Sequence, residues 1–254
     1  VRIVDVGCGR SYLTVVLAWI AKYQWQVPVQ VLGIDRNADV IEECYRRVRL
    51  LQLDECVRFQ HASVEDFAPA AAWAATFGIS ATDEAALDVA SAPPFSIHAV
   101  IALHACDTAT CDALALAIRV GAELIAVAPC CQAEVARGWA AIAEGGGRGA
   151  FAAIWHTPHL RRETGADLTD AMRSVLLRSA GYQVSVIEFV PSEHTRKNTL
   201  IRAVRNPGIS REDRKTYLAQ YAALVQTTGG VGISLANALG APPIATPDSQ
   251  DATA

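Results

Sequence analysis

Short apolar runs rich in β-branched residues alternate along the chain with longer segments whose apolar residues recur every three to four positions. The first run, residues 1–6, ends at glycines, and residues 12–23 follow it with helical spacing. This alternation predicts an α/β domain with a largely parallel sheet and helices on both faces, because parallel neighbours need a crossover segment. The predicted strands are residues 1–6, 29–34, 56–60, 97–103 and 123–128, and the predicted helices are residues 12–23, 38–51, 109–120 and 135–143.

The pattern changes in the last third of the chain. Residues 183–190 and 199–204 predict two strands joined by the connection PSEHTRKN, which favours an antiparallel hairpin at one edge of the sheet. Further predicted segments are helices at residues 168–179 and 211–226, loose helices within the alanine-rich residues 68–92, and an irregular lid or substrate loop after residues 145–149 that holds His156, His159, Arg161 and Arg162.

These elements predict one main domain. It covers residues 1–206, and a C-terminal helix follows within residues 207–228. Residues 229–254 are rich in Gly, Ala, Pro and Thr and predict a flexible tail. Because a strand is predicted from the first residue and no Met precedes it, we expect the chain to begin inside a longer gene product.

Composition narrows the class of protein. The chain has 254 residues, of which 52% are apolar, enough for one large core, and its net charge of -4 argues against a surface that is basic overall. This net charge is compatible with a basic face on one part of the surface. No apolar stretch approaches the roughly 20 residues of a membrane helix. The seven cysteines lack the spacing of a disulfide framework, and no export leader opens the chain, so we predict reduced thiols and a cytoplasmic protein.

The strongest candidate binding motif is DVGCGRS, residues 5–11, directly after the first predicted strand. Gly7 and Gly9 let the backbone pass close to a ligand and adopt positive φ without strain. A dinucleotide-binding loop would have a third glycine where Tyr12 stands, and the acidic Asp5 suits a cationic ligand instead. An ordinary glycine turn is the alternative interpretation.

Two further strand ends offer polar groups at the same edge of the sheet. Asp35 follows the second predicted strand, where a carboxylate is placed to accept both hydroxyls of a ribose or to cap the next helix. Ser63 and Val64 follow the third predicted strand and suit an adenine ring, although Ser63 is equally placed to cap a turn.

The segment LHACDTAT, after the fourth predicted strand, carries the candidates for chemistry. His104 is placed to line the ligand, and Asp107 is placed to orient or deprotonate an oxygen or nitrogen nucleophile. A structural histidine and a helix cap are the alternative interpretations.

Cys130 and Cys131 follow the adjacent strand, where they are placed to meet His104 and Cys106 in a zinc site. Without a CxxC spacing, buried thiols are favoured, and we expect no metal.

The connection between the last two strands is basic. It holds His194, Arg196 and Lys197, and residues 191–217 carry seven Lys or Arg against three Asp or Glu, a local excess of four positive charges. Such a segment suits a phosphate-bearing acceptor, and a solvated charged loop is the alternative interpretation.

Several motifs together indicate a family. DVGCGRSYLTVVL, IALHACDTATCDALALAI, VAPCCQAE, LTDAMRSVLL and EHTRKNTLIRA resemble, in order across residues 1–204, the bacterial branch of the methyltransferase domain family shared with human methyltransferase-like 25 proteins. That family is similar in turn to tRNA 2'-O-methyltransferases with comparable H-x-C, A-T-D and Cys-Cys-His elements. The chain departs from the pattern at residues 111–112, 132–133 and 196, in loops expected to face the acceptor, which puts the identity of the acceptor in doubt.

The resemblance implies a Rossmann-like, seven-stranded class I methyltransferase fold with S-adenosylmethionine as cofactor. The methyl acceptor stays open: RNA, a small molecule or protein, or none in a non-catalytic binding domain. The candidate catalytic residues are Asp107, His104, Lys197 and His194, and the candidate cofactor-binding residues are Asp5, Gly7, Cys8, Gly9, Ser11, Asp35, Arg36, Ser63, Val64, Leu103 and His104.

Overall fold

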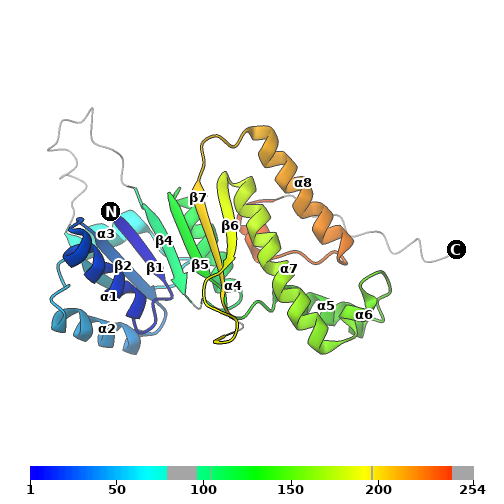
Figure 1. Cartoon of the computed structure of the whole chain (residues 1–254), viewed down its shortest axis with the longest axis horizontal. Helices are drawn as coiled ribbons and strands as arrows, with labels where there is room; N and C mark the ends of the chain where they lie inside the picture. The colour runs from blue at the N-terminus through cyan, green and yellow to red at the C-terminus, as the bar shows by residue number, and fades with distance from the viewer. Residues whose placement is uncertain (79–95, 104, 196, 242–254) are drawn as a thin grey trace.

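The computed structural model describes residues 1–78, 96–103, 105–195 and 197–241, and within these ranges seven strands form one sheet in the order β3-β2-β1-β4-β5-β7-β6 (Figure 1). Strands β1 to β5 are parallel, whereas β7 is antiparallel to both β5 and β6. The predicted Rossmann-like sheet with an antiparallel edge hairpin is therefore confirmed. The strands are β1 Arg2–Val6, β2 Gln30–Asp35, β3 Val57–His61, β4 Ala99–Leu103, β5 Leu124–Ala128, β6 Tyr182–Glu188 and β7 Thr199–Arg205.

Helices cover the sheet on both faces. In β2, Val31 packs in a cluster with α1 and α2, while the next residue, Leu32, packs in the larger cluster that includes α3 and α4. Successive side chains of a strand point to opposite faces, so the two clusters lie on opposite sides of the sheet. The helices are α1 Tyr12–Trp19 with its π-helical continuation η1 Ile20–Trp25, α2 Ala38–Leu50, α3 Pro69–Phe77, α4 Thr108–Arg119, α5 Glu134–Glu144, α6 Ala152–Trp155, α7 Pro158–Ser179, α8 Arg211–Thr227 and α9 Ser234–Ala238.

Local signals explain where several helices begin. Asn37 caps α2, and its side chain accepts hydrogen bonds from the backbone N–H groups of residues 39 and 40. Ser210 and Asp213 form a reciprocal capping box at the start of α8. Figure 1 shows α8 lying along α7 at the end of the molecule opposite α1 and α2. No helix within the described ranges is long and apolar enough to cross a membrane.

The irregular structure predicted after residue 149 is wrong. Residues 152–155 form α6, and α7 begins at Pro158, ten residues earlier than predicted, so His159, Arg161 and Arg162 are helical. Proline suits the first turn of a helix, where its missing N–H has no partner in any case. Gly165 inside α7 allows close packing, because a Cβ there would lie 3.0 Å from the backbone nitrogen of Ala136 in α5. The contact between the two helices therefore explains why a glycine stands inside α7.

The predicted flexible tail, residues 229–254, is wrong as far as residue 241. Leu235 of α9 is fully buried, and Ile233 and Ala236 join it in the main hydrophobic cluster. The backbone N–H of Ser234 donates to the carboxylate of Glu134 in α5 at 2.5 Å. These contacts order a segment whose composition alone indicated a loose chain. Residues 242–254 lie outside the described ranges, as do residues 79–92 of the segment predicted to hold loose helices.

Candidate functional site

A cavity of about 660 Å³ opens at the carboxyl ends of β1, β2, β3 and β4. We call it the main cavity. The strand order reverses between β1 and β4, so the loops after these two strands turn to opposite faces of the sheet and leave a crevice between them. Doubly wound sheets bind ligands at this position, which makes the main cavity the first candidate for a binding site.

The glycine loop after β1 forms one wall of the main cavity. The N–H groups of Gly7 and Cys8 both donate to the carbonyl of Ile34 in β2, at 2.8 and 3.1 Å, which pins the loop to the neighbouring strand. Gly7 and Gly9 have φ of +65° and +50°, a region in which side chains are strained. A Cβ on Gly7 would meet no protein atom within 4 Å. The backbone of Gly7 is therefore open to a ligand in the main cavity.

Asp5 is a nearly buried acid in the wall of the main cavity. Its side chain is 2% exposed, and the hydroxyl of Thr14 donates to its carboxylate at 2.5 Å. Burial raises the pKa of Asp5 to about 7, against a smaller opposing effect of the Thr14 hydrogen bond, and the nearby Asp35 adds to the rise. A cation in the main cavity would stabilise the ionised form of this acid.

Asp35 shapes the glycine loop as well as lining the main cavity. One carboxylate oxygen accepts the N–H of Gly9 and the other accepts the N–H of Asn37, both at 2.9 Å. A carboxylate oxygen has more than one acceptor site, so both oxygens can take another donor. Asp35 thus combines the predicted capacity to accept ligand hydroxyls with a structural role at the start of α2.

Ser63, after the end of β3, was predicted either to face a ligand or to cap a turn. Ser63 lines the main cavity, yet its hydroxyl donates to the carboxylate of Asp66 at 2.8 Å and so closes a local turn. Val64 next to it offers an apolar surface to the same cavity.

Most of the predicted cofactor-binding residues meet at the main cavity. Ser11 is fully buried and does not line it, and His104 lies outside the described residues. Sequence reasoning missed Tyr12, Cys106 and Asp112. Asp112 lies three residues after Ala109, which also lines the main cavity, so helical spacing places both residues on the same face of α4. The predicted residues that line the main cavity are Asp5, Gly7, Cys8, Gly9, Asp35, Arg36, Ser63, Val64 and Leu103.

A second cavity of about 380 Å³ lies beyond the end of β5. Cys130, Cys131 and Lys197 line it together with residues of α7 and the start of β7. Lys197, from the connection between the last two strands, therefore lies at the same cavity as the two cysteines that follow β5. His194 does not line this cavity, and its exposed ring lies 3.6 Å from the carboxylate of Glu193.

Asp107 lines neither cavity. Its carboxylate accepts hydrogen bonds from the backbone N–H of Ala133 at 3.0 Å and from Nη1 of Arg137 at 2.5 Å. Both oxygens of this carboxylate therefore already have a donor at the start of α5. Asp107 thus lies beside the start of α5 and not at either cavity, and its role in proton transfer stays a prediction.

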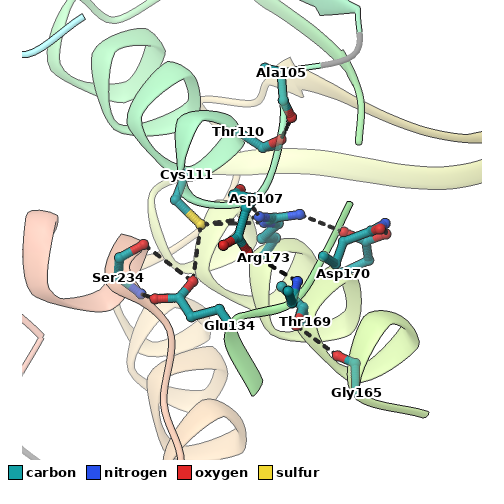
Figure 2. Close-up of polar contacts among 12 residues, drawn as sticks. Ala105, Asp107, Thr110, Cys111, Glu134, Gly165, Thr169, Asp170, Arg173 and Ser234 are labelled. Atoms are coloured by element: carbon teal, nitrogen blue, oxygen red, sulfur yellow. Dashed lines mark hydrogen bonds and ion pairs between the residues drawn. The ribbon is translucent and has the colours of Figure 1, made fainter. Parts of the chain in front are cut away.

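A buried polar network holds the loop that contains Asp107 (Figure 2). The guanidinium of Arg173, fully buried on α7, donates to the carbonyl of Asp107 at 2.8 Å, to the carboxylate of Asp170 at 2.9 Å and to the sulfur of Cys111 at 3.3 Å. Asp107 has φ of +52° and ψ of -116°, which is strained for a residue with a side chain. The network keeps this strained turn between β4 and α4 in place.

Three sulfur atoms meet between the two cavities. The Sγ atoms of Cys106 and Cys130 are 3.3 Å apart, and those of Cys106, Cys130 and Cys131 all lie within 4.8 Å of one another. Burial, together with the neighbouring thiols, raises the pKa of Cys130 to about 12. No disulfide joins these or the other cysteines of the described chain, in agreement with the predicted thiols.

Comparison with known proteins adds a family and several structures. A family model described as a methyltransferase domain matches residues 1–138. No curated protein matches the chain. An rRNA methylase from Streptococcus thermophilus is 11% identical over 81% of this chain and 86% of its own, with a TM-score of 0.41. Magnesium protoporphyrin IX methyltransferase from Synechocystis, solved with bound SAM, is 12% identical over 80% of this chain and 69% of its own, with a TM-score of 0.43. StiE O-MT is 14% identical over 50% of this chain, which spans 36% of its length, with a TM-score of 0.33.

Proposed function

The chain belongs to the methyltransferase domain family and is an S-adenosylmethionine-dependent methyltransferase domain, and from this premise we propose that the main cavity holds the cofactor and that the acceptor is RNA. The observation that carries the cofactor assignment is the buried Asp5 beside the open backbone of Gly7, at the edge of the sheet where its strand order reverses. The finer relationship to bacterial relatives of methyltransferase-like 25 proteins is also part of the proposal and is supported by the motifs in residues 1–204.

Each end of the cofactor has a partner of suitable chemistry in the main cavity. In the proposed binding mode the ammonium of its methionine part lies beside Asp5, the ribose hydroxyls beside Asp35, and the adenine beside Val64, all of which line this cavity. Methyl transfer is an in-line displacement at a sulfonium, so alignment and exclusion of water supply most of the acceleration. The domain therefore requires an acceptor site near Leu103 and Cys106, and a strong base is optional.

The affinity for the demethylated product, S-adenosylhomocysteine, is expected to rise with pH through about 7. Its ammonium binds the ionised form of Asp5, which is the minor form below the raised pKa of about 7. Below that pKa the affinity should change by up to about tenfold per pH unit. Calorimetry between pH 5.5 and about 8.5 measures this slope. The Asp5→Asn variant should bind weakly with little pH dependence, whereas Asp39→Asn, on the exposed first turn of α2, should keep the slope.

The stability of the ligand-free protein should show the opposite dependence on pH. The pKa of Asp5 is higher in the folded chain than its ordinary value of 3.8, so the folded state binds more protons between pH 4 and about 7. The contribution of Asp5 to the free energy of unfolding therefore falls as pH rises through this window. Comparing wild type with Asp5→Asn isolates this contribution from the other titrating groups. If the affinity of the wild type for S-adenosylhomocysteine did not change with pH, this would contradict the role of Asp5 in binding the ammonium group.

An exposed aromatic row supports RNA as the acceptor. Tyr12, Trp19, Tyr23 and Trp25 lie along α1 and η1 with exposed fractions between 42% and 66%. Tyr12, at one end of this row, also lines the main cavity. A cationic side chain lies near two of these rings. The guanidinium of Arg47 is 4.7 Å from the centroid of the Tyr12 ring, and Nζ of Lys22 is 5.4 Å from the centroid of the Tyr23 ring. Aromatic rings with nearby cations are the usual platform for stacking bases of single-stranded RNA.

Incubation of the protein with labelled cofactor and fractionated lysate is expected to place the label in RNA. Trp25→Ala should weaken RNA binding by roughly tenfold, since loss of one stacked base costs about 1–3 kcal/mol. Leu160→Ala, which removes a comparably exposed apolar side chain from α7, should leave RNA binding unchanged. Label in small metabolites or protein would favour the alternative acceptors, for which the compact second cavity is the supporting observation. Cofactor binding without any transfer would identify a non-catalytic domain.

A further inference from the structure

The three clustered thiols come from two neighbouring strand ends. In the parallel pair β4 and β5, Leu103 lies opposite Ala128. Cys106 follows Leu103 by three residues, and Cys130 and Cys131 follow Ala128 by two and three. The pairing register therefore brings all three cysteines to the same edge of the sheet, although 23 residues separate Cys106 from the pair in sequence. The strand register and the loop held by Arg173 both position this cluster.

The spacing of the sulfur atoms suits a thiophilic metal ion. Tetrahedral Zn²⁺ bonds to sulfur at about 2.3 Å, which places its sulfur ligands about 3.8 Å from each other. The cluster has one pair at 3.3 Å and all pairs within 4.8 Å, so small side-chain movements reach this arrangement. Cys106 and Cys131 are exposed and Cys130 is half-buried, which leaves a route for an ion from solvent.

We propose that Cys106, Cys130 and Cys131 form a three-thiolate site for Zn²⁺ with a fourth coordination position left for water or for a group of the methyl acceptor. Cys106 lines the main cavity, while Cys130 and Cys131 line the second cavity, so the ion lies where the two cavities approach each other. Three protein ligands and one open position are typical of zinc sites that act on a ligand, whereas structural sites are closed by four. This site is independent of the identity of the acceptor.

The surroundings suit the charge of such a site. Three thiolates and one Zn²⁺ carry a net charge of -1, and soft thiolate ligands select zinc or Cu⁺ over Mg²⁺ or Ca²⁺. Lys197 and Arg162 line the same second cavity as Cys130 and Cys131. Their positive charges oppose the negative charge of the cluster, while Glu163, Asp167 and Asp170 also line this cavity, so the mixed lining does not repel a cation.

Metal titration of the reduced, chelator-treated protein tests the proposal. We expect one Co²⁺ per chain with thiolate-to-cobalt absorption in the near ultraviolet, displacement of Co²⁺ by one Zn²⁺, and a sub-micromolar Kd for Zn²⁺ in competition with a chromophoric chelator. A parallel titration with Cu⁺ distinguishes a copper site, which would overturn the assignment to zinc if Cu⁺ alone gave a stoichiometric complex.

Serine variants assign the ligands. Cys130→Ser and Cys131→Ser should each weaken Zn²⁺ binding at least about 100-fold, beyond the 10–100-fold typical of residues that only support ligands. Cys131 is exposed, so its variant is expected to fold, which circular dichroism checks. Cys56→Ser is the matched control, because Cys56 is half-buried near the start of β3 and outside the cluster, and its variant should bind Zn²⁺ like wild type. Absence of stoichiometric binding by the reduced wild type, or equal affinities in all three variants, would overturn the site. Since no cofactor or acceptor is needed, this outcome is separate from failure of the proposed methyl transfer.

Discussion

A protein carrying Gly7→Val is expected to bind S-adenosylhomocysteine at least about 100-fold more weakly than wild type, a loss of about 2.7 kcal/mol. A Cβ at residue 7 meets no protein atom within 4 Å, so the valine side chain projects into the space of the main cavity rather than into the fold. The backbone φ of +65° is strained for a β-branched residue, and we expect a loss of stability of about 1–2 kcal/mol in addition. Calorimetry measures the affinity, and thermal unfolding measures the stability.

Gly146→Val separates the two effects. Gly146 also has positive φ, +73°, and open space around its would-be Cβ, but it lies in the turn after α5 and lines neither cavity. Its variant should lose a similar amount of stability and keep wild-type affinity. If both variants bind normally, the glycine loop is only a turn and the main cavity is not the cofactor site.

Arg173→Met is expected to reduce the free energy of unfolding by about 3–5 kcal/mol. The substitution keeps an unbranched apolar side chain in α7 but removes a guanidinium whose side chain is 0% exposed. The buried carboxylate of Asp170 and the carbonyl of Asp107 then lose their charged donor. Burial already raises the pKa of Asp170, and loss of the neighbouring positive charge should raise it further. The midpoint of urea unfolding measures the change.

Two comparisons make the result specific to the buried network. Arg178→Met, on the same helix, removes a half-buried guanidinium that donates to the carbonyl of Val184 at 3.4 Å, and should cost less than about 1 kcal/mol. The double variant of Arg173→Met with Asp170→Asn should be less destabilised than the sum of the single variants, because the second change removes the uncompensated charge. Additive effects, or an Arg173→Met protein as stable as Arg178→Met, would show that the pair contributes little.

The lining of the main cavity could be predicted from the sequence because it depends on short-range features. Asp5, Gly7 and Gly9 stand within five residues of one another, and Asp35 ends the next strand. The carboxyl ends of parallel strands meet at one edge of the sheet, so recognising the strands was sufficient to bring these residues together. The local hydrogen bonds of Ser63 and Asp35 could also be predicted, since each joins residues only two or three positions apart.

The arrangement of the loop after β4 could not be predicted to the same extent. The segment after β4 supplies Asp107, whose side chain turns toward Arg137, and Cys106, whose sulfur meets that of Cys130. Two residues of one loop thus contact different partners. The direction of each side chain depends on the strained turn at Asp107, which Arg173 of α7 holds in place. No periodicity in the loop indicates which of them reaches a cavity.

The sequence by itself determined the order of the seven strands, most of the helices, the glycine loop and the acidic strand ends, because hydrophobic periodicity and turn chemistry act locally. Only the tertiary structure decided that Gly165 belongs to a continuous helix, that Leu235 packs in the core and that three thiols form one cluster. These outcomes depend on which surfaces remain to be covered after the sheet has formed and on the distances between segments far apart in the chain. Burial and close packing between such segments outweigh the local preference of a glycine or of a small-residue tail.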